Sequence, residues 1–296
     1  FAIYAVAVTK TLIRLKKCWE TNLESRISKI FDKLKKENKK AFISFCTGCF
    51  PDYETSLEIN KAIVDAGVSI HEIGFAHAEA QGDGPAIQLA NIEALKNQGT
   101  LEKTIKLASE IRKHNAEVGL VLMGYIGNIF MMGIETFTKK IKGIIDSVIC
   151  VDLSNDVKEE SLLRNSLTKN GIDLIKLVTP TSSDQRIVEI VKNASGFIYS
   201  VNVEGISGHK SADLKTVNKQ ILRVKAKTSL PVVSGFGIKT PQDVFNFAES
   251  EAHGIVVGSS IISKIQQSIE DKTPKHKIAN ILKEYVKELT KGLSKK

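Results

Sequence analysis

Residues 69–91, SIHEIGFAHAEAQGDGPAIQLAN, open with an apolar run typical of a buried strand and continue through a glycine-bounded loop into a helix-period segment. Successive strand-like runs start 24 to 48 residues apart, which leaves room for a helix and two loops each time. This alternation predicts an α/β fold, a closed (β/α)8 TIM barrel. The seven other runs are at 41–47, 117–123, 147–153, 173–179, 197–202, 230–236 and 254–260.

An open doubly wound sheet is the structural alternative to the barrel. Such a sheet would be expected to carry a GxGxxG fingerprint after its first strand. At that point this chain reads FCTGCFPD (45–52), which does not match the fingerprint. The barrel is therefore the preferred prediction.

Amphipathic segments flank the predicted barrel. Residues 24–40 place Ile27, Ile30, Phe31 and Leu34 on one helical face, which predicts an extra N-terminal helix that closes one end of the barrel. Residues 277–293 have the same period and predict a packed terminal helix. Residues 1–21 stay unassigned, as an N-terminal extension, and residues 22–296 are predicted to form a single barrel domain.

Charge and composition exclude several classes of function. The net charge of +9 comes from the chain ends, since residues 1–43 contribute +7, residues 271–296 contribute +5 and the middle carries −3. A basic groove for nucleic acid is not supported. The sequence contains no run of 18 apolar residues, so no membrane span is predicted. Four cysteines in a chain of this length do not form a disulfide framework, so a reducing cytoplasmic location is expected.

Glycine-bearing loops follow the last three predicted strands. In a parallel barrel, reactive groups gather at the carboxyl ends of the strands, and phosphate commonly binds the loops after strands seven and eight. Glycines there let backbone N–H groups approach an anion closely. We expect a phosphate-bearing small molecule as ligand, held by Gly208, Gly235, Gly237, Gly258 and Ser259.

Two carboxylates mark the second strand and the loop after it. If Ile73 and Phe75 face outward, Glu72 faces the barrel interior, where desolvation raises its pKa and suits it to give and take a proton. Asp83 lies between two glycines on a loop that can fold over the same mouth. The structural alternatives are an ion pair of Glu72 with Lys176, and a helix N-cap role for Asp83.

The histidines beside these acids do not indicate a metal centre. His71 alternates with Glu72 and therefore faces away from it, so we expect a hydrogen-bonded core histidine and no metal site. Cys46 and Cys49 form a CxxC without a second pair and without a following helix start.

Six motifs, in order and spacing, resemble the tryptophan synthase alpha subunit family from about residue 24 to about residue 290. The resemblance implies a carbon–carbon lyase that cleaves indole-3-glycerol phosphate to indole and glyceraldehyde 3-phosphate in tryptophan biosynthesis. It also implies no cofactor in this chain, and a pyridoxal-phosphate beta subunit as partner in an alpha2-beta2 tetramer. The motifs are EIG (72–74), DGPAIQLAN (83–91), LMGY (122–125), GFIYSVNVEGISG (196–208), SGFGIKTPQDV (234–244) and GIVVGSS (254–260).

The resemblance also implies roles for individual residues. Glu72 corresponds to the general acid/base that protonates the indole ring carbon and takes the side-chain hydroxyl proton. Asp83 corresponds to the carboxylate that holds the indole N–H as positive charge develops. Residues that match the indole pocket are Tyr199, Phe45, Tyr125 and Phe236.

The chain departs from the family pattern mainly in its loops. Where the family reads PFSDPxA, this chain reads AHAEAQG (76–82), which removes two prolines and predicts a less ordered loop.

There are two alternatives to the lyase function. One is a weakened or non-catalytic alpha subunit that binds and activates a beta subunit. The other is a different phosphate-binding barrel enzyme, such as an aldolase that forms a Schiff base through Lys176. Further departures are Phe50, Ser154, Asn202 and Ser207.

Overall fold

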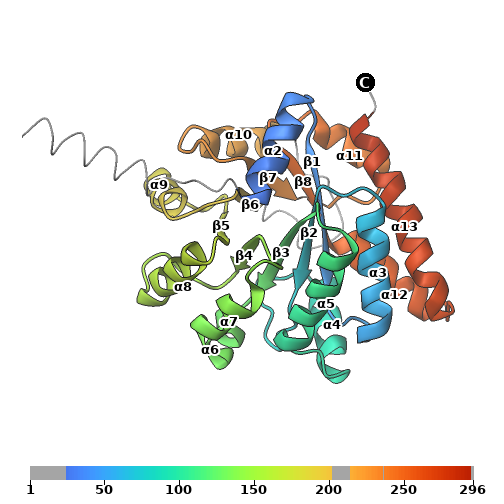
Figure 1. The fold of residues 1–296 in the computed structure, drawn as a ribbon. Coiled ribbons are helices and arrows are strands. Elements are labelled where there is room, and N and C mark those ends of the chain that lie inside the picture. Colours follow the sequence, from blue (N-terminus) through green and yellow to red (C-terminus); the bar gives the residue numbers. More distant parts are fainter. Residues whose placement is uncertain (1–24, 202–213, 236, 295–296) are drawn as a thin grey trace, which may run out of the picture.

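Eight parallel strands close into a barrel, in the order of the chain, in the computed structural model (Figure 1). The structure describes residues 25–201, 214–235 and 237–294, so the unassigned segment 1–21 lies outside the described residues. The predicted (β/α)8 barrel is confirmed, and the open sheet is excluded because β1 pairs with β8. The strands are β1 (Ala41–Thr47), β2 (Ile70–Gly74), β3 (Gly119–Gly124), β4 (Ser147–Cys150), β5 (Asp173–Val178), β6 (Ile198–Val201), β7 (Val232–Gly235) and β8 (Gly254–Val257).

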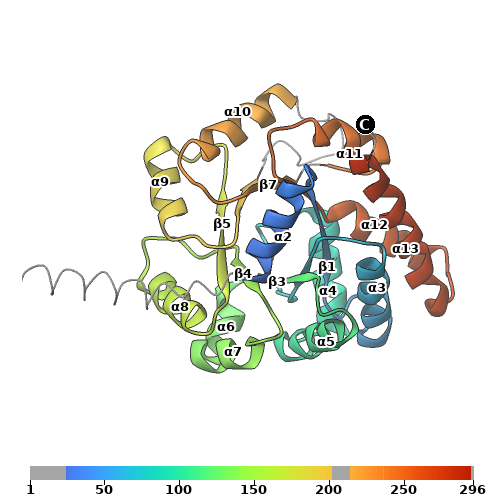
Figure 2. The same cartoon turned by 45° about the horizontal axis from the view of Figure 1, so that its top comes forward.

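Helices surround the barrel as a ring, which Figure 2 shows from near one end of it. Extra helices fill the longer connections, since β2 and β3 are joined by two helices. The helices are α2 (Arg26–Lys36), α3 (Tyr53–Asp65), α4 (Pro85–Lys96), α5 (Leu101–His114), α6 (Ile126–Met132), α7 (Ile134–Ile141), α8 (Lys158–Lys169), α9 (Asp184–Lys192), α10 (Leu214–Lys225), α11 (Pro241–Ala248), α12 (Ser259–Glu270) and α13 (Lys275–Lys291), followed by the short η1 (Gly292–Ser294).

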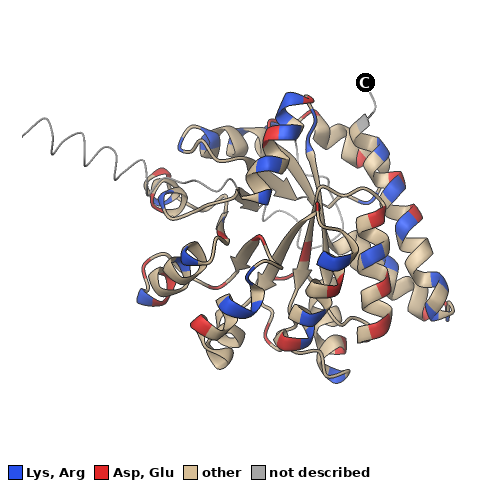
Figure 3. Ribbon diagram, viewed as in Figure 1, with Lys and Arg blue, Asp and Glu red and all other residues tan. Residues whose placement is uncertain are grey.

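Charged residues lie mainly on this outer ring. Figure 3 shows Lys and Arg interspersed with Asp and Glu on the outer helices. The lysines of α2 are exposed to solvent. Among the helices that the structure describes, none is long and apolar enough to cross a membrane.

Side-chain alternation divides each strand between two apolar layers. Inward-facing residues such as Ile43, Ile70 and Val121 form one buried cluster inside the barrel. Outward-facing residues such as Phe42 and Ile73 form a larger cluster beneath the helices. Because neighbouring parallel strands hold a fixed register, inward residues of adjacent strands meet in layers.

The N-terminal helix closes the end of the barrel at which the strands begin. Ile27 and Phe31 of α2 belong to the interior cluster, and the Phe31 ring meets Phe197 edge-on with centroids 5.8 Å apart. A Cβ atom on Gly119, the first residue of β3, would lie 2.9 Å from Ile27 Cδ1, so glycine makes room for the helix. The predicted closing helix is confirmed, which leaves the opposite end as the open mouth.

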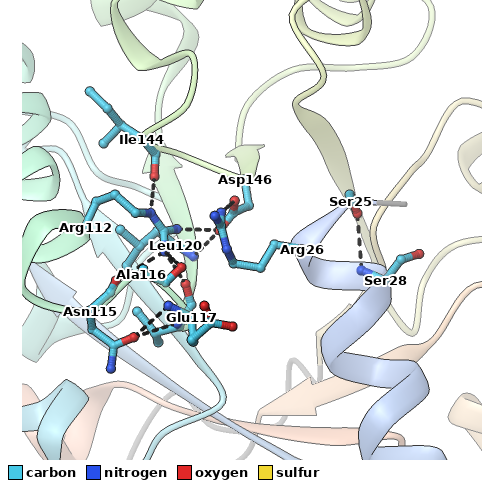
Figure 4. A network of polar contacts seen from close by, with 11 residues as sticks. Ser25, Arg26, Ser28, Arg112, Asn115, Ala116, Glu117, Leu120, Ile144 and Asp146 are labelled. Atoms are coloured by element: carbon cyan, nitrogen blue, oxygen red, sulfur yellow. Dashed lines mark hydrogen bonds and ion pairs between the residues drawn. The ribbon is translucent and has the colours of Figure 1, made fainter. Parts of the chain in front are cut away.

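A buried aspartate fixes this closed end. Asp146, whose side chain is 8% exposed, accepts hydrogen bonds from Arg112 Nη2 at 2.7 Å and from the Leu120 N–H at 2.8 Å. Arg26 of α2 also pairs with Asp146, and Arg112 donates to the carbonyls of Ile144 and Val118 (Figure 4). The network ties α2, α5 and the start of β4 together.

Replacing Asp146 with alanine is expected to destabilise the barrel. The change leaves the largely buried Arg112 guanidinium and the buried Leu120 N–H without this acceptor, which costs about 3 kcal/mol of the free energy of unfolding. Urea denaturation followed by circular dichroism measures the loss. The matched control is Asp156→Ala, which breaks the exposed pair with Arg186 and should leave the unfolding midpoint unchanged. Equal midpoints for the two variants would show that the network is not stabilising.

Candidate active site

Glu72 is a buried carboxyl at the open half of the barrel. It faces inward from β2 between Phe45 of β1 and Val121 of β3, its partners in strand register, and it is 1% exposed. Its Oε1 atom has no hydrogen-bond partner in the described part of the chain. Burial raises the pKa of Glu72 to about 8, so the carboxyl exchanges its proton near neutral pH.

Lys176 does not neutralise this acid. It faces outward from β5, where its Nζ lies 2.9 Å from Oε1 of Glu160 on α8. The alternative in which Glu72 pairs with Lys176 is therefore wrong. The same placement argues against a Schiff base at Lys176, because the amine lies under a helix and not in the barrel interior.

Asp83 lies on the loop that leads from β2 to α4. Its Oδ2 accepts hydrogen bonds from the Tyr125 hydroxyl at 3.2 Å and from Asn91 Nδ2 at 3.4 Å. Burial raises the pKa of Asp83 to about 6, against the opposing effect of those two donors and of the nearby His77. The N-cap of α4 is Gly84, which makes no side-chain capping bond, so the helix-cap alternative for Asp83 is wrong.

Tyr199 connects the two acids electrostatically. Its pKa is raised first by burial and then by the negative charges of Glu72 and Asp83, so both acids lie within electrostatic reach of its hydroxyl. A Cβ atom on Gly235 would lie 2.7 Å from that hydroxyl, so the glycine at the end of β7 gives the tyrosine room. The structure thus places the Tyr199 side chain within electrostatic range of both Glu72 and Asp83.

Phe45 lies beside Glu72 and reaches toward the last strand. Its ring occupies the space above Gly74, where a Cβ atom would lie 2.8 Å from Phe45 Cζ. A Cβ atom on Gly258 would meet the Phe45 Cβ at 3.2 Å, so the same residue packs against the start of α12. Phe45 is therefore a buried aromatic wall between Glu72 and the glycine loop at Gly258, and Tyr125 is a buried aromatic residue beside Asp83.

The glycine loops offer backbone donors to an anion. Ser259 begins the 12-residue helix α12, whose N-cap Gly258 makes no side-chain capping bond, so no capping side chain covers the first N–H groups of the helix. Gly237 has a φ of +41°, a left-handed conformation that favours glycine. Two predicted site residues, Gly208 and Phe236, lie outside the described residues.

His71 is a core histidine, as predicted. Its Nδ1 lies 2.8 Å from Ser44 Oγ and its Nε2 lies 2.6 Å from Asn60 Oδ1, beneath α3. Burial lowers its pKa to about 3, so the ring is neutral.

Cys46 and Cys49 are buried, and burial raises the pKa of both thiols. Within residues 25–201, 214–235 and 237–294, no three His, Cys, Asp or Glu side chains are grouped to hold a metal.

Sequence reasoning missed the polar residues that hold Asp83. Asn91 lies eight residues further along, and this spacing along α4 is the signal that two helical turns return it to Asp83. His77 stacks on Tyr125, with ring centroids 4.7 Å apart and planes at 15°. No local pattern indicates this stack, because it joins the β2 loop to the start of α6.

Comparison with known proteins gives one consistent result. The family model described as "Tryptophan synthase alpha chain" matches residues 31–292. A solved structure from Aquifex aeolicus VF5 is 32% identical, with a TM-score of 0.79 over 91% of this chain and 99% of that one. Tryptophan synthase subunit alpha from Legionella pneumophila str. Paris is 28% identical, with a TM-score of 0.83 over 91% and 98% of the two chains.

A tryptophan synthase structure from Mycobacterium tuberculosis, 24% identical with a TM-score of 0.82 over 92% of this chain and 99% of that one, shares the fold. The family match covers almost all of the barrel, and its EIG and DGPxIQ motifs carry Glu72 and Asp83. The chain belongs to the tryptophan synthase alpha chain family, whose members are lyases that cleave indole-3-glycerol phosphate.

Proposed function

We propose that Glu72 is the general acid/base with which this chain cleaves indole-3-glycerol phosphate. The observation that carries the proposal is a carboxyl that is 1% exposed, whose Oε1 lacks a partner among the described residues, at the open half of a barrel interior. Such a group has a raised pKa and exists in both protonation states near neutral pH.

The reaction requires one proton to arrive and one to leave. Protonation of the indole C3 by Glu72 makes the ring an electron sink, and the bond from C3 to the glycerol side chain then breaks. The electron pair of that bond returns to the ring and restores the neutral indole. The hydroxyl on the adjacent carbon loses its proton to Glu72 and becomes the aldehyde of glyceraldehyde 3-phosphate. Glu72 therefore ends in the state in which it began.

Asp83 complements this step at the ring nitrogen. The protonated ring carries positive charge on its N–H, and an ionised carboxylate held beside it stabilises that charge where it develops. The hydrogen bonds from Tyr125 and Asn91 fix one oxygen of Asp83 on the loop. Its pKa of about 6 lies below that of Glu72, so near neutrality one acid is protonated while the other is ionised.

We assign the phosphate and the indole ring of the substrate to the open end of the barrel. We assign the substrate phosphate to the loops with Gly235, Gly237, Gly258 and Ser259, where α12 begins without a capping side chain. Phe45, Tyr125 and Tyr199 supply apolar walls for the indole ring. Gly208 and Phe236 complete the phosphate and indole sites by the family resemblance alone.

The proposed partner is a tryptophan synthase beta subunit in an alpha2-beta2 tetramer. Family membership supports this partner, and so do exposed apolar side chains on the two helices that leave the mouth. Leu89 of α4 is 59% exposed and Met131 of α6 is 90% exposed. We propose that this chain needs no cofactor of its own and that pyridoxal phosphate belongs to the beta subunit.

Glu72→Gln is expected to abolish indole release. The amide keeps the shape of the side chain but cannot transfer protons, so the rate of cleavage should fall by about 1,000-fold. Indole formation from indole-3-glycerol phosphate is measured with the purified chain, with and without a beta subunit. Wild-type activity raised by the partner supports the proposal. A wild-type chain that forms no indole, yet still stimulates the partner, would establish the non-catalytic alternative instead.

The same variant is expected to be more stable than the wild type at pH 8. The pKa of Glu72 in the folded chain is about 8, above its ordinary value of 4.5. The contribution of protonated Glu72 to the free energy of unfolding is therefore complete below pH 4.5 and declines as the pH rises to about 8. Glutamine does not ionise and avoids this decline. Thermal melting at pH 5 and pH 8 checks the expectation, which fails if the variant melts lower at pH 8.

The pH profile of kcat/KM is expected to be bell-shaped. Activity should fall below about pH 6 as Asp83 is protonated, and fall above about pH 8 as Glu72 loses the proton that it donates. Asp83→Asn should lower kcat by about 100-fold and remove the acidic limb. Steady-state kinetics from pH 5 to pH 9 in both chains measures this. An acidic limb that survives in Asp83→Asn would assign it to another group.

A further inference from the structure

His77 lies in the stretch where the chain departs most from its family. In the segment that replaces PFSDPxA with AHAEAQG, His77 stands where the family pattern has phenylalanine. The ring stacks on Tyr125, with centroids 4.7 Å apart and an interplanar angle of 15°. Phenylalanine would provide such a face but no polar edge, so histidine adds something that stacking alone does not.

The polar edge of His77 is used. Its Nδ1 lies 2.7 Å from Asn128 Oδ1 on α6, and Asn128 Nδ2 donates to the Ala76 carbonyl at 3.4 Å. Because Asn128 presents its oxygen to the ring, Nδ1 is the protonated donor of this pair. The hydrogen bond sets the plane of the imidazole and ties the altered loop to α6.

Tyr125 is the link from His77 to Asp83. Its hydroxyl donates to Asp83 Oδ2 at 3.2 Å and accepts a hydrogen bond from the Gly82 N–H at 3.0 Å. A Cβ atom on Gly82 would lie 2.6 Å from Val151 Cγ1 and 3.2 Å from the Tyr125 hydroxyl, so glycine permits this approach. The phenol is thus held at its tip by the loop and on its face by His77.

We propose that His77 is a positioning residue, which together with Asn128 holds the Tyr125 ring so that its hydroxyl fixes Asp83 for the indole N–H. This inference rests on the proposed function and deepens it. His77 does not contact the reacting atoms, and it acts through Tyr125. The hydrogen-bonded stack takes over the loop-fixing role of the two prolines that the family pattern has and this chain lacks.

The test combines His77→Ala, Tyr125→Phe and the double variant. His77→Ala is expected to lower kcat by about tenfold while KM changes by less than about threefold, since the misplaced acid matters most when charge develops. In the Tyr125→Phe background the same change should cost less than about twofold, because the hydroxyl through which His77 acts is gone. Losses that multiply independently would overturn the proposal, and so would a His77→Ala chain with wild-type kcat.

His77→Phe separates stacking from the hydrogen bond and serves if the alanine variant does not fold. It keeps an aromatic face on Tyr125, so its kcat should lie between those of the wild type and His77→Ala. A His77→Phe chain as slow as the alanine variant would show that the stack contributes nothing. The matched control is His114→Ala, which removes an exposed histidine paired with Asp65 and should leave kcat unchanged.

Indole affinity, measured by calorimetry, tests the positioning role of His77 independently of the proposed catalysis. His77→Ala and Tyr125→Phe should both weaken indole binding by about two- to threefold, because each misplaces the acceptor of the indole N–H while the ring is still uncharged. A wild-type chain that binds indole but releases none would sink the proposed catalysis and leave the positioning role standing. Unchanged indole affinity in both variants would overturn the positioning role.

Discussion

Closure of the barrel is the constraint on which the site depends. Once eight strands close, every second residue of each strand faces a largely buried interior, and a carboxyl placed there loses most of its solvation. Glu72 occupies such a position on β2, in register with Phe45. Its raised pKa is a consequence of topology, because burial alone accounts for the shift. The barrel thus converts an ordinary glutamate into an acid that exchanges protons near neutrality.

The buried charges of Asp146, Lys176 and Asp83 have polar partners, whereas one oxygen of Glu72 has none among the described residues. At the closed end, Asp146 is surrounded by two arginines and a backbone donor, and beneath α8 Lys176 is paired with Glu160. These charges have partners and contribute to structure. At the open end, Oε1 of Glu72 has no partner among the described residues. An unsatisfied buried acid is costly to the fold, and it persists where the chemistry needs it.

Much of this arrangement could be predicted from the sequence, because strand and helix periods are local. The inward direction of Glu72 followed from the alternation of side chains along the strand. If Ile73 and Phe75 face outward beneath the helices, Glu72 must face inward. The alternatives that involve Lys176 stayed open because DLIKLV has apolar residues on both faces, so alternation does not reveal which face Lys176 takes. A capping role for Asp83 stayed open because Asp83 is only one residue before Gly84, the actual N-cap of α4. Only the backbone conformation shows which of the two residues is the N-cap. The His77 stack joins distant segments and leaves no local signal.

The altered loop is held by contacts with neighbouring elements and contains no proline between Ala76 and Gly82. Prolines restrain a loop by limiting the unfolded chain, whereas hydrogen bonds and stacking restrain it through its neighbours. In this chain the neighbours are Tyr125 and Asn128, both at the start of α6. Rigidity of the loop therefore depends on the packing of β3 and α6, the elements that also place the partner of Asp83. The Tyr125 hydroxyl bonds both the Gly82 N–H of the loop and Asp83 Oδ2, so a perturbation of α6 that moves this hydroxyl would disturb the loop and the orientation of Asp83 together.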